Sequence, residues 1–344
     1  MSRRCTRCQT VYEGDARFCP RDGSPLVDVA GGAPKPSSKG KHPTPQTLVR
    51  AAIQRQAGGL APEQASTLKG QTLDRRYRVD RRLGEGGMSY VYEAREINTN
   101  KSVAVKVLTP KLLADETALQ RLRREAGLAM RLNHPNVCNI LRLGETESGM
   151  IYLVMPYLKG ELLSEREAKT GPMPLEMAMP FIHQICEGLH HAHGLQIIHR
   201  DLKPENVMIV DDGGPERAVV MDFGLAKGRG SAAMKKLTAT GIVLGTPEFM
   251  SPEQVRGKEI DARSDIYALA ILAFEMLTGK LPFEGRSAQE MMIARLRGAP
   301  VPIRKHRPDL SADLEKVLLK AMQVAPDNRY SSMQELGDAL GGAV

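Results

Sequence analysis

The sequence predicts an α+β fold, with strands near the start of a long C-terminal region and helices after them. Apolar and polar residues alternate over residues 77–83 and again over residues 90–95, which is the two-residue period of a half-buried β-strand. Later segments repeat their apolar residues every three or four positions, the period of an amphipathic helix. Strands followed by helices along the chain are typical of an α+β domain.

Length and composition are those of a globular protein. The chain has 344 residues, 42% of them apolar and 26% charged, enough for one large or two medium domains. No apolar run approaches the roughly 18 residues of a membrane-spanning helix, and no apolar stretch follows the charged start of the chain. Neither a transmembrane segment nor a secretory signal is therefore predicted, and we expect a cytoplasmic protein.

Positive charge is concentrated in the N-terminal part. Of the net charge of +8, residues 1–76 hold 13 Lys and Arg against 6 Asp and Glu, and residues 77–344 hold 35 against 34. A basic segment can attract nucleic acid, acidic proteins or anionic lipid, or it can be a solvated tail. We favour the solvated tail and do not expect nucleic acid as a partner.

The first 27 residues contain a candidate zinc site. Cys5 and Cys8 form a Cys-x-x-Cys turn. A second turn begins at Cys19 and places Asp22 where a zinc ribbon has its fourth Cys. So short a segment cannot bury a core unaided, so we interpret residues 1–27 as a zinc-ribbon-like module that holds Zn²⁺, with a metal-free remnant as the alternative. Such a module would dock a partner or play a structural role.

A flexible linker is predicted over residues 28–72. Residues 28–47 are rich in Gly, Ala, Pro, Ser and Lys, a composition of low hydrophobicity that prevents regular structure. The main domain is then expected over residues 73–342.

A glycine-rich turn joins the first two strands of that domain. Residues 84–89 read Gly-Glu-Gly-Gly-Met-Ser, and glycine leaves backbone N–H groups uncovered, so a phosphate can approach closely. A strand follows this turn instead of a helix, and no Gly-Lys-Ser/Thr follows it, which argues against a dinucleotide-binding fingerprint and a P-loop. Taken alone, the turn is better explained as a plain hairpin.

Two oppositely charged residues lie in the next two elements. Residues 102–108 form an apolar, β-branched run that predicts a buried strand, and Lys106 interrupts it. A buried lysine is costly unless it is paired or serves a ligand. Residues 115–131 predict a helix with Glu125 beside its apolar stripe. That stripe consists of Leu119, Leu122, Ala126 and Ala129.

Four later elements follow from apolar patterns. They are a strand over residues 151–155, a helix over 174–194, a hairpin of strands over 207–210 and 218–221, and a helix over 265–279. Pro180 is expected to kink the first helix or shift its start. The four histidines of that helix are interpreted as structural or solvated, since no carboxylate or cysteine set accompanies them.

The most informative stretch is residues 199–206, which reads His-Arg-Asp-Leu-Lys-Pro-Glu-Asn. Asp201 can accept a proton from a hydroxyl group, and Lys203 can neutralise charge on a moving phosphoryl group. Asn206 can hold a divalent cation through its amide oxygen. Phosphoryl transfer needs these parts, because its barrier is lowered mostly by positioning and charge stabilisation. About twenty residues later, Asp222 opens an Asp-Phe-Gly sequence at a strand end.

These motifs, in this order, resemble those of the protein kinase family, most of all bacterial serine/threonine kinases of the eukaryotic (Hanks) type. Ser89 stands in the place of the third glycine of the glycine-rich loop and Val91 in that of its valine, while residues 251–253, Ser-Pro-Glu, resemble the Ala-Pro-Glu motif. The resemblance covers roughly residues 77–342. It implies a two-lobed kinase fold, with a β-rich N-lobe over about 73–155 and a mostly helical C-lobe over about 159–342.

The resemblance implies transfer of the γ-phosphoryl group of ATP to Ser or Thr hydroxyls of proteins in bacterial signal transduction, with Mg²⁺ or Mn²⁺. Asp201 would be the base and Lys203 would stabilise the transferring charge. Lys106 would grip the phosphates and pair with Glu125. Magnesium would be held by Asn206 and Asp222. The residues expected to bind ATP are Leu83, Gly84, Glu85, Gly86, Gly87, Met88, Ser89, Val91, Ala104, Lys106, Met155, Pro156, Tyr157, Leu158 and Met208.

The resemblance also implies regulation in the loop over residues 225–244. Phosphate on Thr238 or Thr240 would pair with Arg200 and order this loop, so we expect activation by autophosphorylation. Thr246 would belong to the platform that receives the peptide.

Two structural contacts are implied as well. Asp265 would tie down the catalytic loop, and Arg329 would pair with Glu253.

Two alternatives stay open. A pseudokinase scaffold would keep the fold without chemistry, although Lys106, Asp201, Asn206 and Asp222 are all present. A small-molecule phosphotransferase would share the catalytic Asp and Asn, but it is not expected to have Thr246 and the Ser-Pro-Glu segment.

Overall fold

The chain divides into two compact units, Met1–Gly58 and Gly59–Val344. The computed structural model describes residues 2–5, 11–13, 26–28, 67–86, 89–109, 116–223, 247–285 and 287–344. In the first unit these residues form an antiparallel sheet in the order β2-β1-β3, from β1 (Ser2–Cys5), β2 (Val11–Glu13) and β3 (Leu26–Asp28). Cys8, Cys19, Asp22 and the side chain of Cys5 lie outside the described residues, so the zinc site stays a prediction.

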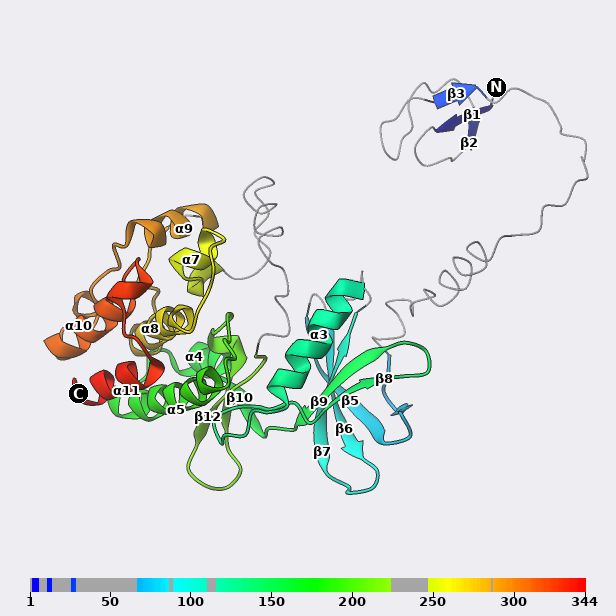
Figure 1. Cartoon of the computed structure of the whole chain (residues 1–344), viewed down its shortest axis with the longest axis horizontal. Helices are drawn as coiled ribbons and strands as arrows, with labels where there is room; N and C mark the ends of the chain where they lie inside the picture. Colours follow the sequence, from blue (N-terminus) through cyan, green and yellow to red (C-terminus); the bar gives the residue numbers. More distant parts are fainter. Residues whose placement is uncertain are drawn as a thin grey trace, which may run out of the picture. The chain divides into compact units, whose positions relative to one another are not determined.

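The second unit begins with a curled antiparallel sheet (Figure 1). Its order is β4-β5-β6-β7-β9-β8, from β4 (Thr72–Leu73), β5 (Tyr77–Gly86), β6 (Ser89–Glu96), β7 (Ser102–Leu108), β8 (Arg142–Glu145) and β9 (Ile151–Pro156). One face buries Tyr77, Tyr92 and Tyr152 among valines. Leu68 is only 2% exposed in the same cluster, so part of the segment expected to be linker packs onto this sheet.

The other face of the sheet receives α3 (Glu116–Ala129), as the apolar stripe of that helix predicted. Leu122, Ala126 and Ala129 are buried in one core with Leu108 of β7 and Leu153 of β9. The helix is shorter than the predicted range by one residue at its start and two at its end. Glu125, three residues after Leu122, is half-buried at the margin of this contact.

The helical lobe is built around α8 (Arg263–Thr278). Fourteen of its 16 residues are buried, so it is apolar on all sides and other helices pack around it. Gly279 ends it with a left-handed φ of 66°, which glycine adopts without strain. The other helices are α4 (Leu163–Thr170), α5 (Leu175–Gly194), α7 (Pro252–Val255), α9 (Ala288–Arg297), α10 (Ala312–Ala321) and α11 (Met333–Gly341).

A small antiparallel sheet adjoins residues 199–206, which we call the catalytic stretch (Figure 1). Its order is β10-β11-β12, from β10 (Gly160–Leu162), β11 (Val207–Val210) and β12 (Arg217–Val220). The predicted hairpin is therefore confirmed, together with the two-lobed arrangement. Two 3-10 turns complete the region, η2 (Pro204–Asn206) and η3 (Pro247–Phe249).

Pro180 does not shift the start of α5, which begins at Leu175 directly after Pro174. A proline inside a helix deprives the carbonyl four residues earlier of its N–H partner. Here that carbonyl belongs to Glu176, and both Glu176 and Pro180 are exposed, so water can reach it. Of the two outcomes expected for Pro180, the shifted start is not found, and the kink stays a prediction.

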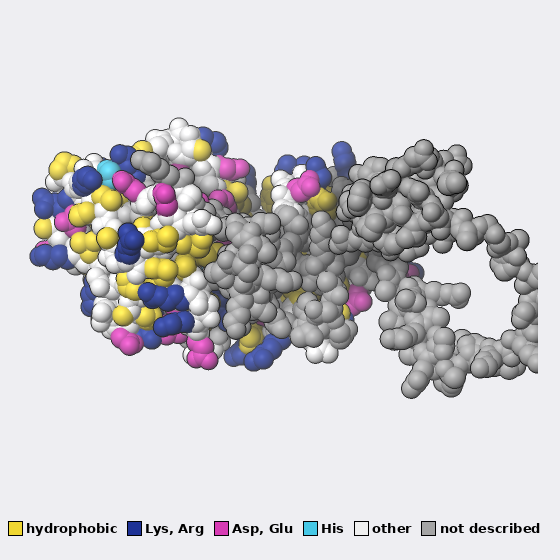
Figure 2. Space-filling view, turned by 90° about the horizontal axis from the view of Figure 1, so that it is seen from above, with side chains coloured by type: hydrophobic (Ala, Val, Ile, Leu, Met, Phe, Trp, Pro, Cys, Tyr) yellow, Lys and Arg dark blue, Asp and Glu magenta, His cyan; other side chains and the backbone are white. Residues whose placement is uncertain are grey.

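The surface of the helical lobe mixes charges of both signs with hydrophobic side chains, as Figure 2 shows for one face. This pattern agrees with the near balance of charge over residues 77–344. In the part of the chain that the structure describes, no helix is both long and apolar enough to cross a membrane.

The expected pair of Arg329 and Glu253 is confirmed. The Arg329 side chain is fully buried and donates to both carboxylate oxygens of Glu253, each at 2.8 Å. Its remaining N–H groups donate to the carbonyls of Gln323, Arg263 and Val324. Every donor of this guanidinium is therefore used, which is the condition under which a buried ion pair is tolerated.

We expect Arg329→Met to lower the free energy of unfolding by about 3–5 kcal/mol, because it leaves the Glu253 carboxylate buried without its cation. The exposed pair of Lys316 and Asp313 gives the matched control, and Lys316→Met should leave the unfolding midpoint unchanged. Urea unfolding of the three proteins measures both effects. Equal unfolding midpoints for Arg329→Met and the unsubstituted protein would contradict this account.

Candidate active site

The buried carboxylate of Asp265 binds the backbone of the catalytic stretch. Asp265 of α8 is 1% exposed and accepts hydrogen bonds from the backbone N–H groups of His199 at 2.8 Å and Arg200 at 2.9 Å. It also lies 2.8 Å from Nε2 of His193. Burial alone would raise the pKa of Asp265, but its bond to His193 and the nearby histidines outweigh burial and hold the pKa below its usual range. The predicted anchoring role of Asp265 is confirmed.

Arg200 is held in an unusual backbone conformation. Its φ is 67°, in the left-handed region that a side chain disfavours, at a cost of about 1 kcal/mol. Its N–H is bound by Asp265, and its carbonyl accepts a 2.7 Å hydrogen bond from the amide of Gln254. Gln254 is fixed in turn because it caps α7 together with Ser251. The motif Ser-Pro-Glu-Gln thus supports the catalytic stretch from a second side.

His199 joins the catalytic stretch to the segment that carries Asp222. Its Nδ1 accepts the backbone N–H of Asp201 at 3.2 Å, so Nε2 carries the ring proton and donates to the carbonyl of Met221 at 2.7 Å. The ring is fully buried and meets the ring of Phe223 edge-on at 4.8 Å. The His199 ring therefore links the backbone of Asp201 to the Asp-Phe-Gly sequence.

Asn206 lies beside Asp201. Its Nδ2 donates to the Asp201 carbonyl at 2.7 Å and lies 3.5 Å from the Asp201 carboxylate. The backbone carbonyl of Asn206 accepts the N–H of Met221 at 2.8 Å. Because the amide nitrogen is used in this way, the side-chain oxygen of Asn206 is the atom that can face a cation.

Lys106 of the sheet forms an ion pair with Asp222 of the helical lobe. Nζ of Lys106 in β7 lies 2.7 Å from Oδ1 of Asp222, which follows β12 and has a φ of 59°. Burial favours the neutral form of Asp222, but the attraction and hydrogen bond of Lys106, with help from His199 and Lys203, lower its pKa below the usual range. Asp222 is therefore a carboxylate near neutral pH, as an oxygen ligand for a hard cation must be.

The pairing of Lys106 with Glu125 stays a prediction. Glu125 lies on α3, which packs against the same sheet that carries Lys106. The close partner of Lys106 is Asp222.

An apolar cluster bridges the two lobes next to this ion pair. Buried Met155 of β9 packs with Cys138, Val210 and Val219, and partly buried side chains extend the cluster. Four of the residues expected to bind ATP belong to it, coming from β7, β9, the segment after β9 and β11. They are Ala104, Met155, Leu158 and Met208. A flat apolar ring could enter this cluster at its partly buried side.

The glycine-rich turn continues the β5–β6 ladder. Gly84 pairs with Val91, and Gly86 pairs with Ser89. Val91 pairs on its other side with Lys106, so the turn and the lysine belong to neighbouring positions of one sheet. Gly87 and Met88 lie outside the described residues.

The segment between the lobes is linked to β5. Pro156 still pairs with Val103 at the end of β9. The hydroxyl of Tyr157 accepts a 3.3 Å hydrogen bond from Arg81, which also forms a 2.7 Å ion pair with Glu93.

Three further residues predicted for the site cannot be placed. Thr238, Thr240 and Thr246 lie outside the described residues, so the regulatory loop and the peptide platform stay predictions. Two supporting residues were missed by the sequence reasoning. Gln254 contacts a residue 54 positions away and His193 one 72 positions away, and no local pattern signals either bond.

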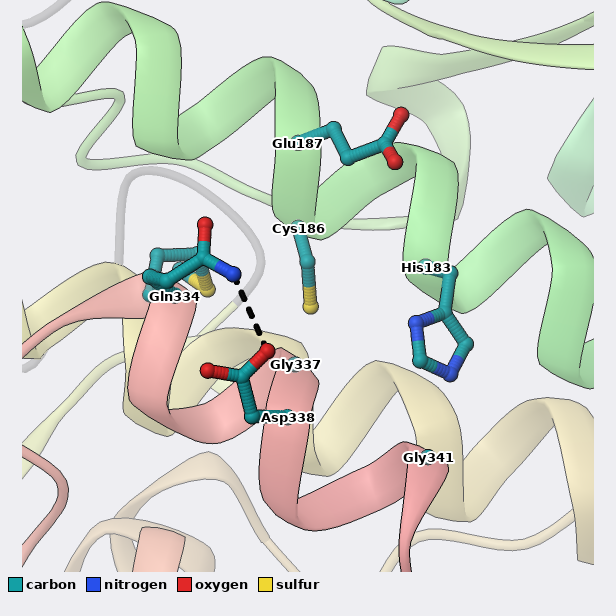
Figure 3. Close-up of a pocket in the computed structure, with 8 residues that line it drawn as sticks. His183, Cys186, Glu187, Gln334, Gly337, Asp338 and Gly341 are labelled. Carbon is teal, nitrogen blue, oxygen red and sulfur yellow. Dashed lines mark hydrogen bonds between the residues drawn. The ribbon is translucent and has the colours of Figure 1, made fainter.

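A separate cleft of about 360 Å³ lies between α5 and α11 (Figure 3). None of the residues predicted for catalysis or ATP binding lines it. Its walls come from His183, Cys186, Glu187, Met333, Gln334, Gly337, Asp338 and Gly341.

The fold and the arranged motifs define a protein kinase domain, and comparison with known proteins agrees. The sequence pattern of the protein kinase domain family matches residues 77–339, so the chain belongs to this family. Serine/threonine-protein kinase pkn3 of Myxococcus xanthus is 40% identical over 269 residues, 77% of this chain and 49% of the relative. PknB of Mycobacterium leprae is 40% identical over 267 residues, 77% of this chain and 42% of the relative.

A solved structure supports the same assignment. The crystal structure of the Mycobacterium tuberculosis PknI kinase domain superposes with a TM-score of 0.64 at 28% identity, covering 80% of this chain and 98% of that chain. The present chain spans about half, or less, of the length of the curated relatives named above.

Two carboxyl groups near the catalytic stretch have raised pKa values. Burial, followed by the charges of Glu275 and Glu205, raises the pKa of Glu167 to about 8. Burial, followed by Glu205 and Glu248, raises the pKa of Glu275 to about 7. The ordinary value is 4.5, so between pH 4.5 and these values the unfolded chain ionises while the folded protein keeps the proton. Folding therefore becomes less favourable as pH rises through this window.

Glu167→Gln removes the ionisation and should stabilise the protein only at high pH. We expect a melting temperature higher by on the order of 5 °C at about pH 9 and unchanged at about pH 5. Glu147→Gln, at an exposed position, is the control and should shift neither value. If Glu167→Gln and the unsubstituted protein show parallel pH profiles, Glu167 does not hold its proton in the folded state.

Proposed function

We propose that this chain is a serine/threonine protein kinase that transfers the γ-phosphoryl group of ATP to Ser or Thr hydroxyls of proteins. The observation that carries the proposal is the 2.7 Å contact between Lys106 and Asp222, formed across the two lobes beside Asp201 and Asn206. The site combines the ammonium of Lys106, the carboxylate of Asp222 and the amide oxygen of Asn206 with one apolar cluster. This combination is suited to a nucleotide, because the polar groups can hold its phosphates and the cluster can hold its flat base. The relatives named as serine/threonine kinases favour the same reading.

The donor set fits a hard divalent cation. The carboxylate of Asp222 and the side-chain oxygen of Asn206 are oxygen ligands of the type that Mg²⁺ or Mn²⁺ prefers. The ion, when bound with ATP, would neutralise charge on the phosphates. Lys106 would hold the phosphates from the side of the sheet, within reach of Asp222.

Asp201 would orient the acceptor hydroxyl and take its proton. His199 fixes the backbone N–H of Asp201, and Asn206 binds its carbonyl, so the carboxylate is positioned before the substrate arrives. Lys203, two residues along the same loop, would offset charge on the transferring group. Adenine would lie against Ala104 and Met208, at the partly buried side of the apolar cluster.

The alternatives have less support. A pseudokinase is disfavoured because the four side chains needed for transfer are present and two of them are in direct contact. A small-molecule phosphotransferase is disfavoured because the matched relatives are named protein kinases. For the N-terminal unit we propose Zn²⁺ on Cys5, Cys8, Cys19 and Asp22 and a docking role, which the zinc content of the full chain would decide.

Asp201→Asn should lower phosphoryl transfer by at least about 10³-fold, because the amide cannot accept the hydroxyl proton. The measurement is transfer of labelled γ-phosphate from ATP to a casein-like protein, with an aminoglycoside as the competing acceptor. Asp313→Asn, on the exposed face of α10, should retain full activity. Labelling of the aminoglycoside but not of the protein would refute the proposal, as would undiminished labelling by Asp201→Asn.

We also propose that phosphate on Thr238 or Thr240 activates the enzyme by pairing with Arg200. The double variant Thr238→Ala/Thr240→Ala should lose on the order of tenfold in activity after preincubation with ATP, and it should match the unsubstituted enzyme before preincubation. Phosphopeptide mapping shows whether these sites are used. Full activity of the double variant after preincubation would end the idea.

A further inference from the structure

A second buried arginine lies near the active site, and its contacts differ from those of Arg329. Arg295 of α9 is 0% exposed, and its guanidinium lies 5.4 Å from the centre of the Phe283 ring. Phe283 stacks in turn on Tyr267 of α8. Nη2 of Arg295 donates to the backbone carbonyl of Glu248 in η3. Among the described residues, no acceptor meets its Nε or Nη1, although both atoms are buried.

Stability alone does not explain this arginine. Burying a guanidinium without a carboxylate partner disfavours folding, and an apolar side chain of similar size would pack at this position with less cost. Arg329 also lies near Tyr267, with its guanidinium 4.8 Å from the centre of that ring. Every N–H donor of the Arg329 guanidinium has an acceptor. An apolar side chain could make neither the contact of the cation with the Phe283 ring nor the hydrogen bond to the carbonyl of Glu248, and only the second contact reaches outside the core of α8 and α9.

That carbonyl belongs to a turn that borders the catalytic stretch. Glu248 lies in η3, whose last residue is Phe249. Phe249 and Met250 line a small cavity together with Arg200 and Asp201. Ser264 and Asp265 of α8 line the same cavity, so η3 borders the catalytic stretch on the side that α8 supports. A shift of η3 would therefore change the packing that holds Arg200 and Asp201 in place.

We propose that Arg295 is a positioning residue for the protein acceptor, acting through the Glu248 carbonyl to hold η3 against the catalytic stretch. The proposal rests on the kinase function proposed above. It separates the two substrates, because ATP would bind against β7, β9 and β11, whereas the hydrogen bond of Arg295 ends on η3. Loss of the guanidinium should impair use of the protein substrate and leave use of ATP unchanged.

The test compares Arg295→Met with Arg295→Lys, which keeps a cationic donor, and with Arg297→Met, an exposed arginine of the same helix. We expect Arg295→Met to raise KM for a casein-like protein by about tenfold while KM for ATP changes by less than about twofold. Its melting temperature should be no lower than that of the unsubstituted protein. Arg295→Lys should recover most of the loss, and Arg297→Met should change nothing.

Hydrogen exchange of the backbone amides of residues 248–251 gives a readout that does not depend on activity. Arg295→Met should exchange faster there, and the Lys variant should not. The proposal is overturned if exchange at 248–251 is unchanged, if both KM values rise together, or if activity is lost only in step with a lower melting temperature. An unsubstituted protein that labels no polypeptide would instead refute the kinase function, and the exchange measurement would still decide whether Arg295 holds η3.

Discussion

The buried carboxylate of Asp265 is the constraint on which the active site depends. It lies on the helix that is enclosed on nearly all sides, so its position is fixed by the packing of the whole helical lobe. A carboxylate with 1% exposure persists only if hydrogen bonds replace its water, and here two backbone N–H groups and one imidazole do so. The catalytic stretch has no regular structure before η2, so its rigidity comes from contacts with the core, and Asp265 supplies two of its backbone hydrogen bonds.

From Asp265 the constraint passes to the sheet in a few steps. The carboxylate holds the backbone of His199, the ring of His199 holds the carbonyl of Met221, and the next residue, Asp222, meets Lys106. Arg200 and Asp222, which lie at two points of this chain of contacts, both have left-handed φ values. Such conformations persist only where surrounding bonds determine them, and they cluster at functional sites. The strain is thus located where the reacting groups must be held.

The sequence predicted those parts of the fold that local chemistry decides. The strand over residues 102–108 and the helix ending at Gly279 follow from β-branched runs, helical periodicity and a left-handed glycine. The strand has the expected bounds, and the helix begins two residues earlier than expected, at Arg263. For Pro180 a local rule left a kink and a shifted start open, because it does not say which side of the helix faces water. The contact between Lys106 and Asp222 spans 116 positions, and the apolar cluster at Met155 gathers side chains from separate elements. Spacing carries no information on such convergence. The resemblance to a family placed these residues in one site, but it paired Lys106 with Glu125 and did not predict its contact with Asp222.

The two buried arginines show how stability and function divide within one core. Both lie near Tyr267, yet Arg329 has a carboxylate and three carbonyls, whereas Arg295 has one backbone carbonyl among the described residues. A saturated ion pair is expected where a charge is kept for the integrity of the fold. A buried guanidinium with unused N–H donors is a local conflict, and such conflicts in a natural sequence are expected at positions that serve function. Because the hydrogen bond of Arg295 ends on the turn that borders Arg200 and Asp201, the position of α9 and the packing of the catalytic stretch are physically linked.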